Sequence, residues 1–279
     1  MIAVCIILIS LIILYLFAIR PNTGRQTQVR PFEETYIAHR GLHANPNIPE
    51  NSMAAFRRAV EAGYGIELDV QLTTDDRLVV FHDETLERVC GDNRKLHELT
   101  YEQLQELRLF GTEERIPLFR DVLDTIGGRV PLIVEIKSEG RYPRTTELTC
   151  DTLRVYTGKY CIESFHPMVL RQVEKLLPET LRGQLSTDYS KENVRRPAWQ
   201  RFLLTNLMMD FLSKPDFIAY DRQYSDQLSF LLCRRLYRPV CAAWTVRSRE
   251  QLEKGRAAFS IFIFEGFDPG SKEHKGETL

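Results

Sequence analysis

The sequence has no excess of charge of either sign, few cysteines and no low-complexity segment before its last ten residues. Its 279 residues include 37 lysines and arginines and 38 aspartates and glutamates, which gives a net charge of −1. A net charge so close to zero argues against a general nucleic-acid binder. The composition, 43% hydrophobic and 27% charged, excludes a disordered chain, a collagen-like chain and a small disulfide-rich scaffold.

Charge is also absent from the first nineteen residues, MIAVCIILISLIILYLFAI. As a helix this run would span roughly 28 Å, close to the thickness of a hydrocarbon core. No Lys or Arg precedes the run and no A-x-A-like site follows it, which disfavours a cleavable signal peptide. A buried core helix is disfavoured because the run has no polar face. We therefore expect residues 1–20 to form one transmembrane anchor, with residues 1–19 in the membrane.

Two cues indicate the side of the membrane on which the rest of the chain lies. Arg20, Arg25 and Arg30 follow the apolar run, and a basic flank favours the cytoplasm. The six cysteines show neither a zinc pattern nor a compact disulfide framework. Cys5 lies in the run, and the odd number that remains fits reduced thiols. We expect a cell-membrane localisation with the folded domain in the cytoplasm.

Three segments follow the predicted anchor. Residues 21–34 are predicted to be a polar linker, residues 35–269 one domain and residues 270–279 a flexible tail. In the domain, short apolar runs alternate with helical patterns. Ser52 is a candidate N-cap, and Ser248 with Gln251 fits a capping box.

The short apolar runs predict nine strands. These are Tyr36–His39, Gly65–Leu72, Leu78–His82, Pro131–Ile136, Tyr160–Phe165, Arg182–Leu185, Asp216–Tyr220, Val240–Thr245 and Ser260–Phe264. Their alternation with helices favours βαβ units and an α/β fold. Nine candidates suggest a TIM (β/α)8 barrel with one extra strand. An open doubly wound sheet is the alternative, although no G-x-G-x-x-G follows the first strand.

Polar residues gather at the carboxyl ends of the predicted strands, where barrels build their active sites. Glu67 and Asp69 lie two apart on one strand and therefore on one face, and Glu135 lies on another strand. Three carboxylates in a shared interior would repel one another, and a hard divalent cation removes that problem. Oxygen ligands without a His/Cys cluster suggest one Mg²⁺ or Ca²⁺ ion over Zn²⁺.

The run from Glu67 to His82 predicts a hairpin, because Thr73–Arg77 is too short for a crossover helix. Antiparallel pairing about Asp75 would bring His82 close to the acid pair. His39 and His82 can move protons near neutral pH, and Arg40 and Lys137 can neutralise phosphate oxygens. Together with a metal, these groups favour phosphoryl chemistry.

The ordered motifs H-R-G, P-E-N-S, E-L-D-V, V-F-H-D and E-I-K, followed by E-S-F and A-A-W-T-V, resemble the glycerophosphodiester phosphodiesterase family. This family lies in the PLC-like phosphodiesterase superfamily, and the resemblance, to a membrane-anchored bacterial-type member, runs from about residue 37 to 269. It implies a TIM barrel with a small insertion, here residues 83–116.

The resemblance also implies roles for single residues. Glu67, Asp69 and Glu135 are similar to the family's metal ligands, and His39 and His82 to its general acid/base pair. The residues that would bind substrate or phosphate, or shape that site, are Arg40, Lys137, Glu50, Asn51 and Trp244. Ser164 and Gln184 are candidate rim residues, and His43 is a candidate substrate contact.

Three places depart from the family pattern. Asp76 stands where many relatives have Gly after T-x-D, which affects only the turn. The other two lie near the carboxyl ends of the last two strands. Arg247 follows W-T-V, where Asn is frequent, and the last strand ends F-E-G-F-D-P, where T-D-x-P is usual. Both changes fall at the predicted rim, so they bear on the alcohol group of the substrate and not on phosphodiester chemistry.

The resemblance implies a phosphoric diester hydrolase that converts a glycerophosphodiester to sn-glycerol 3-phosphate and an alcohol. The alternatives are a lysophospholipase D-type phosphodiesterase acting on lysolipids, a catalytically inactive membrane-anchored binding module and, on fold alone, a metal-dependent barrel lyase or isomerase. The expected partners are a small-molecule substrate, a divalent cation and the membrane, with no nucleic acid.

Overall fold

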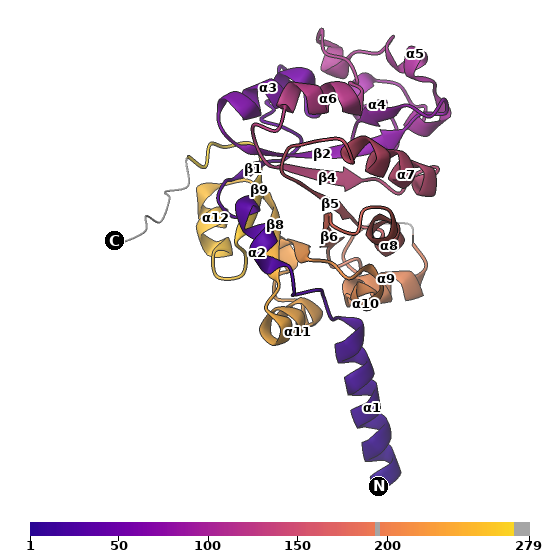
Figure 1. The fold of residues 1–279 in the computed structure, drawn as a ribbon, viewed down its shortest axis with the longest axis vertical. Coiled ribbons are helices and arrows are strands. Elements are labelled where there is room, and N and C mark those ends of the chain that lie inside the picture. Colours follow the sequence, from indigo (N-terminus) through magenta and orange to yellow (C-terminus); the bar gives the residue numbers. More distant parts are fainter. Residues whose placement is uncertain (193–195, 271–279) are drawn as a thin grey trace.

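Eight parallel strands close into a barrel in the computed structural model, which describes residues 1–192 and 196–270 (Figure 1). In barrel order they are β1 (Ile37–Ala38), β2 (Gly65–Leu72), β4 (Leu132–Ile136), β5 (Tyr160–Ser164), β6 (Leu181–Ser186), β7 (Phe217–Asp221), β8 (Val240–Val246) and β9 (Ile261–Phe264). Ile37 in β1 pairs with both Gly65 and Ile263, which closes the ring. The TIM-like barrel is thus confirmed over the open sheet, and the extra strand is β3 (Leu78–Val80), antiparallel to β2.

Alternation along the strands separates the barrel interior from the helical layer. Leu132, Val134 and Ile136 of β4 belong to the larger apolar core, with the helices, whereas Ile133 belongs to the barrel's inner core. Glu135 continues the face of Ile133, because successive side chains point to opposite sides of a strand. The interior is therefore apolar toward the amino ends of the strands and acidic toward their carboxyl ends.

Helices connect the strands and cover the barrel. They are α3 (Met53–Glu61), α6 (Phe119–Ile126), α7 (Tyr142–Leu153), α8 (Pro167–Leu176), α9 (Ala198–Thr205), α10 (Asp210–Ser213), α11 (Leu228–Tyr237) and α12 (Arg249–Gly255). The predicted N-caps are confirmed, because Ser52 and Ser248 each accept a backbone hydrogen bond within their own helix. The Gln251 side chain, however, accepts from the backbone N–H of Arg247, so the reciprocal half of the predicted capping box does not form.

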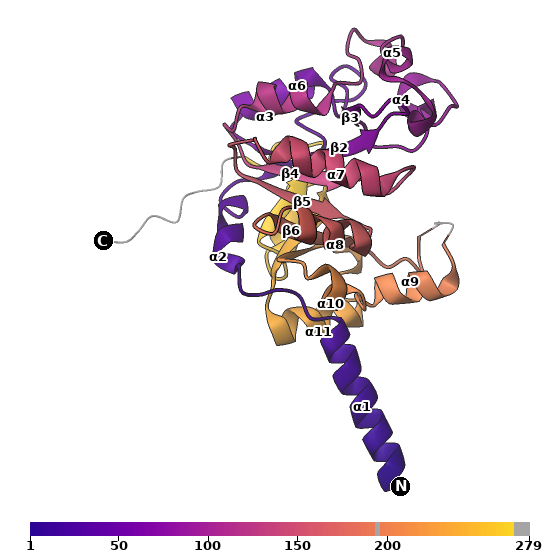
Figure 2. The same ribbon diagram turned by 45° about the vertical axis from the view of Figure 1, so that its right-hand side comes forward.

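Residues 83–116 form a lobe beside the barrel, at the end of the molecule opposite to the N-terminus (Figure 2). The lobe contains α4 (Glu87–Cys90), α5 (Tyr101–Leu104) and two 3-10 helices, η2 (Leu96–Glu98) and η3 (Leu109–Gly111). A small apolar cluster joins the lobe to the hairpin of β3, and it includes the buried side chains of Leu86, Leu96, Leu104 and Leu109 together with Val79 and Phe81.

The predicted transmembrane anchor, and with it the cell-membrane localisation with a cytoplasmic domain, is wrong. Helix α1 covers Ile2–Ala18, 17 residues, or about 26 Å, which is short of a hydrocarbon core of roughly 30 Å. The end of the apolar run is part of the folded domain, since Ile19 is fully buried and the Tyr237 hydroxyl donates to the Leu16 carbonyl over 2.7 Å. In the described residues, no helix combines the length and apolar character needed to cross a membrane.

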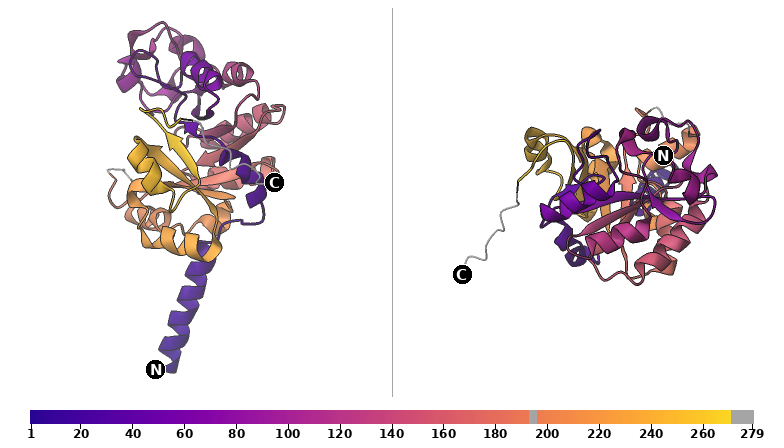
Figure 3. Two further views of the ribbon diagram at one scale, coloured as in Figure 1. Left: turned by 90° about the vertical axis from the view of Figure 1, so that its left-hand side faces the viewer. Right: turned by 90° about the horizontal axis from the view of Figure 1, so that it is seen from above.

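The segment after α1 packs against the barrel. It contains α2 (Gln26–Val29) and the 3-10 helix η1 (Arg30–Phe32), and the side chains of Val29 and Phe32 are buried in the inner core. Asn22 donates to Asp216 over 2.7 Å. Helix α1 itself points away from the barrel (Figure 3). Of the tail predicted at residues 270–279, all but Gly270 lies outside the described residues.

Candidate active site

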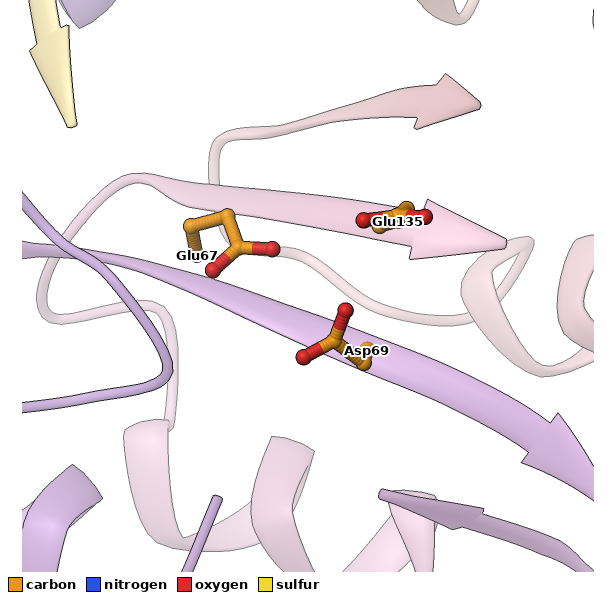
Figure 4. A group of neighbouring side chains, drawn as sticks. All are labelled: Glu67, Asp69 and Glu135. Carbon is orange, nitrogen blue, oxygen red and sulfur yellow. The ribbon is translucent and has the colours of Figure 1, made fainter. Parts of the chain in front are cut away.

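Three buried carboxylates from the neighbouring strands β2 and β4 lie close together inside the barrel (Figure 4). Glu67 and Asp69 lie on β2, and Glu135 on β4 pairs with Asp69 in the strand register. Each residue offers an oxygen that lies within 4.8 Å of the others, and none is more than 6% exposed. The structure therefore brings the three predicted metal ligands together.

The charges of this triad are only partly balanced by the protein. Burial and the neighbouring carboxylates of Asp69, Glu163 and Glu135 raise the pKa of Glu67 well above its ordinary value. Burial also raises the pKa of Glu135, to about 7, although Lys137 opposes the shift. An all-oxygen donor set with uncompensated negative charge fits a hard divalent cation.

Two cations border the triad. The Lys137 ammonium lies 2.8 Å from Asp69 Oδ1 and 2.9 Å from Glu135 Oε1. Burial alone would lower the pKa of Lys137, but the charges of Asp69 and Glu135 raise it, so the ammonium stays protonated. Arg40 donates its backbone N–H to Glu67 over 2.9 Å, and its guanidinium Nε lies 3.6 Å from Asp69.

Glu50 and Asn51, from the loop after β1, hold members of this cluster. Asn51 donates its side-chain amide to Asp69 over 2.8 Å. Glu50 accepts from the guanidinium of Arg40 over 2.6 Å and is also paired with Arg88 from the lobe. Glu50 therefore orients the guanidinium of Arg40, and Asn51 orients a triad carboxylate.

His39 lies at the end of β1, beside the triad. Its Nε2 is 4.0 Å from Glu67 Oε2, and its Nδ1 is 2.6 Å from Glu265 Oε2. Burial, helped by the charge of Arg40, lowers the pKa of His39 to about 4. With its Nδ1–H donated to Glu265, the neutral imidazole keeps a lone pair on Nε2.

The predicted hairpin that carries His82 is confirmed. Val80 pairs with Val70, and the N–H of Phe81 donates to the Asp69 carbonyl over 3.0 Å, so the next residue, His82, follows at the level of the triad. His82 Nδ1 lies 2.6 Å from Asp83 Oδ1. Burial and the charge of Lys137 lower the pKa of His82.

A pocket of about 280 Å³ opens beside Glu135 and Lys137. Its aromatic wall is formed by Phe165, Tyr189 and Trp244, and the rings of Phe165 and Trp244 meet edge to face with centroids 5.4 Å apart. Trp244 therefore borders a cavity next to the triad, as does the predicted rim residue Ser164.

Two predicted candidates remain. Gln184 lies inside the barrel, and His43 lies near the site. The Gln184 amide donates to the carbonyls of Ser164 and Leu185, and its side chain is buried among the strands. His43 Nε2 lies 3.8 Å from Glu265, which places this histidine in contact with the partner of His39.

Several site residues were not predicted from the sequence. Glu265 directly follows β9, the strand that closes the barrel against β1. In a closed barrel the residue after the last strand lies beside His39, which follows the first strand, and this closure could have identified Glu265. Asp83 and Arg88 follow His82 and form a salt bridge of 2.7 Å. Glu163 on β5 pairs in register with Glu135 and is buried, and one of its carboxylate oxygens has no hydrogen-bond partner among the described residues.

The family model described as "Glycerophosphoryl diester phosphodiesterase family" matches residues 39–259. A glycerophosphodiester phosphodiesterase of Caldanaerobacter subterraneus subsp. tengcongensis is 41% identical over 160 residues, 53% of this chain and 65% of that relative. One of Bacillus altitudinis is 35% identical over 164 residues, 54% of this chain and 66% of the relative. The chain thus spans just under two thirds of the length of these two relatives. The human lysophospholipase D GDPD1 is 34% identical over 130 residues, 42% of this chain and 40% of that protein.

Solved structures of similar proteins share the fold. An Oleispira antarctica phosphodiesterase in complex with the product sn-glycerol-3-phosphate superposes with a TM-score of 0.66 at 22% identity, over 83% of this chain and 92% of that one. A glycerophosphodiester phosphodiesterase of Thermotoga maritima gives 0.62 at 23% identity, over 82% and 94%.

Proposed function

Since the chain belongs to the glycerophosphoryl diester phosphodiesterase family, we propose that it is a metal-dependent hydrolase that converts a glycerophosphodiester to sn-glycerol 3-phosphate and an alcohol. One observation carries the proposal. A buried carboxylate triad lies within one cluster with two histidines and two cations, which are the groups that phosphodiester hydrolysis needs. The same completeness argues against an inactive binding module.

The residues of the chain divide the work between them. When bound by Glu67, Asp69 and Glu135, a divalent cation, Mg²⁺ or Ca²⁺, would supply Lewis-acid polarisation of a phosphate oxygen. Lys137 and Arg40 face the same space and neutralise the phosphate charge, Arg40 with a planar fork suited to two oxygens.

The two histidines move the protons. His39 is neutral and accepts the nucleophile's proton on Nε2, whether that nucleophile is water or the neighbouring glycerol hydroxyl, which would give a cyclic phosphate. His82 donates a proton to the leaving alkoxide, and Asp83 stabilises its charged form through the 2.6 Å hydrogen bond.

The pocket next to Lys137 supports binding of the organic part of the substrate. Its edge-to-face pair of Phe165 and Trp244 offers an apolar surface. That surface also favours a second candidate function, a lysophospholipase D-type reaction in which the substrate carries an acyl chain. The similarity to human lysophospholipase D GDPD1 points the same way.

A substrate panel with purified protein tests the proposal. We expect release of sn-glycerol 3-phosphate from glycerophosphocholine, -ethanolamine, -glycerol or -inositol, or of a lysophosphatidate from lysophospholipid, with Mg²⁺ or Ca²⁺ present and none after EDTA. An EDTA-insensitive enzyme would refute the metal site.

The acid/base assignment is tested with histidine variants. His39→Ala and His82→Ala should each lose at least about 100-fold in kcat while their circular dichroism spectra and Tm match those of the wild type. His97→Ala, on η2 of the lobe, is the matched control and should keep its activity. Full turnover by either site variant would remove the assignment.

A further inference from the structure

Glu265 is an acid that no part of the proposed reaction uses directly, yet it is joined to a histidine that the reaction needs. We propose that Glu265 is the positioning residue of His39, and that Arg247 holds its carboxylate in place. The inference rests on the proposed function, because it assigns to His39 the task of accepting a proton.

The two carboxylate oxygens of Glu265 have separate partners. Oε2 lies 2.6 Å from His39 Nδ1 and 3.8 Å from His43 Nε2, and Oε1 accepts from Arg247 Nε over 2.6 Å. The Glu265 side chain is 19% exposed and that of His39 13% exposed. Because each oxygen is occupied, the carboxylate has one favoured orientation, and the imidazole of His39 is fixed with it.

The barrel itself creates this arrangement. The N–H of His39 donates to the Phe264 carbonyl over 2.9 Å, and the N–H of Glu265 donates to the Val246 carbonyl over 3.0 Å. The first residues after β1, β9 and β8 therefore lie side by side, and these are His39, Glu265 and Arg247. Groups placed directly at strand ends hold their geometry better than groups on long loops.

The position of the proton on His39 follows from this contact. A carboxylate can only accept, so His39 must carry its proton on Nδ1, and Nε2 is left free on the side of Glu67. Burial would raise the pKa of Glu265, but the hydrogen bond from His39, the neighbouring His43 and the charge of Arg247 lower it, so the carboxylate is ionised. When Nε2 takes the nucleophile's proton, the ionised Glu265 stabilises the imidazolium that forms.

A double-mutant cycle separates this role from a structural one. We expect Glu265→Gln to lower kcat about 10- to 100-fold with KM within about twofold, because the amide can present an N–H to Nδ1 and favour the wrong tautomer. In a His39→Ala background the same substitution should cause no further loss. Glu250→Gln, an exposed acid paired with Lys254, is the matched control and should leave kcat unchanged.

An unchanged kcat in Glu265→Gln, or an equal loss with and without His39, would overturn the proposal. If Glu265→Gln does not fold, Arg247→Gln is the second variant, at a side chain that is 53% exposed. It should lower kcat in the wild type and cause no further loss in the His39→Ala background.

A measurement without turnover keeps the proposal apart from the proposed function. Proton NMR should show a downfield imidazole N–H resonance that is absent from His39→Ala and lost or shifted upfield in Glu265→Gln. If the wild type hydrolyses none of the substrates, the proposed function fails, while this resonance still reports the Glu265–His39 contact. A resonance unaffected by Glu265→Gln would overturn the positioning role.

Discussion

Glu50 is a buried carboxylate that two arginines hold ionised. Burial would raise its pKa, but hydrogen bonds and charges from Arg88 and Arg40 lower the pKa from its usual 4.5 to about 2. A carboxyl group whose pKa is lowered by folding stabilises the fold above its unfolded pKa, and this stabilisation is lost as the pH falls toward the folded pKa. The difference between the two values corresponds to on the order of 3 kcal/mol.

Glu50→Gln should therefore destabilise the protein in a pH-dependent way. We expect the loss in unfolding free energy, measured by urea denaturation, to be largest near pH 7 and to shrink between pH 4.5 and pH 3, because protonated wild-type Glu50 resembles the variant. Glu113→Gln, whose side chain is 94% exposed, is the control and should change the unfolding free energy little. A difference for Glu50→Gln that stays constant from pH 7 to pH 3 would contradict the prediction.

At the scale of an element, the packing of β6 against β7 requires a glycine on β6. Gly183 on β6 pairs in register with Phe217 on β7, and a Cβ at position 183 would overlap the Phe217 ring. Gly183→Ala should thus destabilise the barrel by about 1–3 kcal/mol, the usual cost of overpacking a core.

Rescue by a smaller partner distinguishes overpacking from a general loss of strand stability. We expect Gly183→Ala with Phe217→Leu to be more stable than the sum of the single changes implies, by about 1 kcal/mol, in urea unfolding. Gly24→Ala, which would make only an ordinary contact with Asn22, should change stability little. Additive effects of the two substitutions would exclude the proposed clash.

The strands were predictable because their local pattern is strong, and the error at the N-terminus has a physical reason. All nine predicted strands exist, with ends that differ by a few residues, since apolar runs bounded by turn residues mark them directly. The first nineteen residues show the opposite case. Their hydropathy indicates a membrane span, but Ile19 and Ala18 are buried by the folded domain, and no local pattern shows that long-range contact.

The site at the scale of the whole molecule was predictable only in part. The residues of the triad share one strand or neighbouring strands, so spacing and parallel pairing were enough to group Glu67, Asp69 and Glu135. Glu265 was missed because its link to His39 depends on closure of the barrel, which joins the first strand to the last. The family pattern also gave no help, because the chain departs from it at this strand end.

A barrel that gathers buried acids should gain global stability from a cation. Burial and mutual repulsion raise the pKa values of Glu67 and of Glu163, so the ionised groups weaken the metal-free fold near neutral pH. A cation that binds only the folded state at a concentration 100 times its Kd adds about 2.7 kcal/mol. For a chain of this size that corresponds to a rise in Tm of roughly 5–10 °C.

Two neutral variants separate repulsion from coordination in this experiment. Glu67→Gln and Glu163→Gln should both raise the Tm of the EDTA-treated protein, because each removes a buried charge from the acidic interior. Only Glu67→Gln should lose the further rise on adding Mg²⁺ or Ca²⁺, since Glu163 is not one of the three residues whose oxygens converge. Scanning calorimetry over a cation titration measures both effects. If the cation raises the Tm of the wild type and of Glu67→Gln equally, the triad does not bind the ion. If only Glu163→Gln loses the cation-induced rise in Tm, the ion binds at Glu163 on β5.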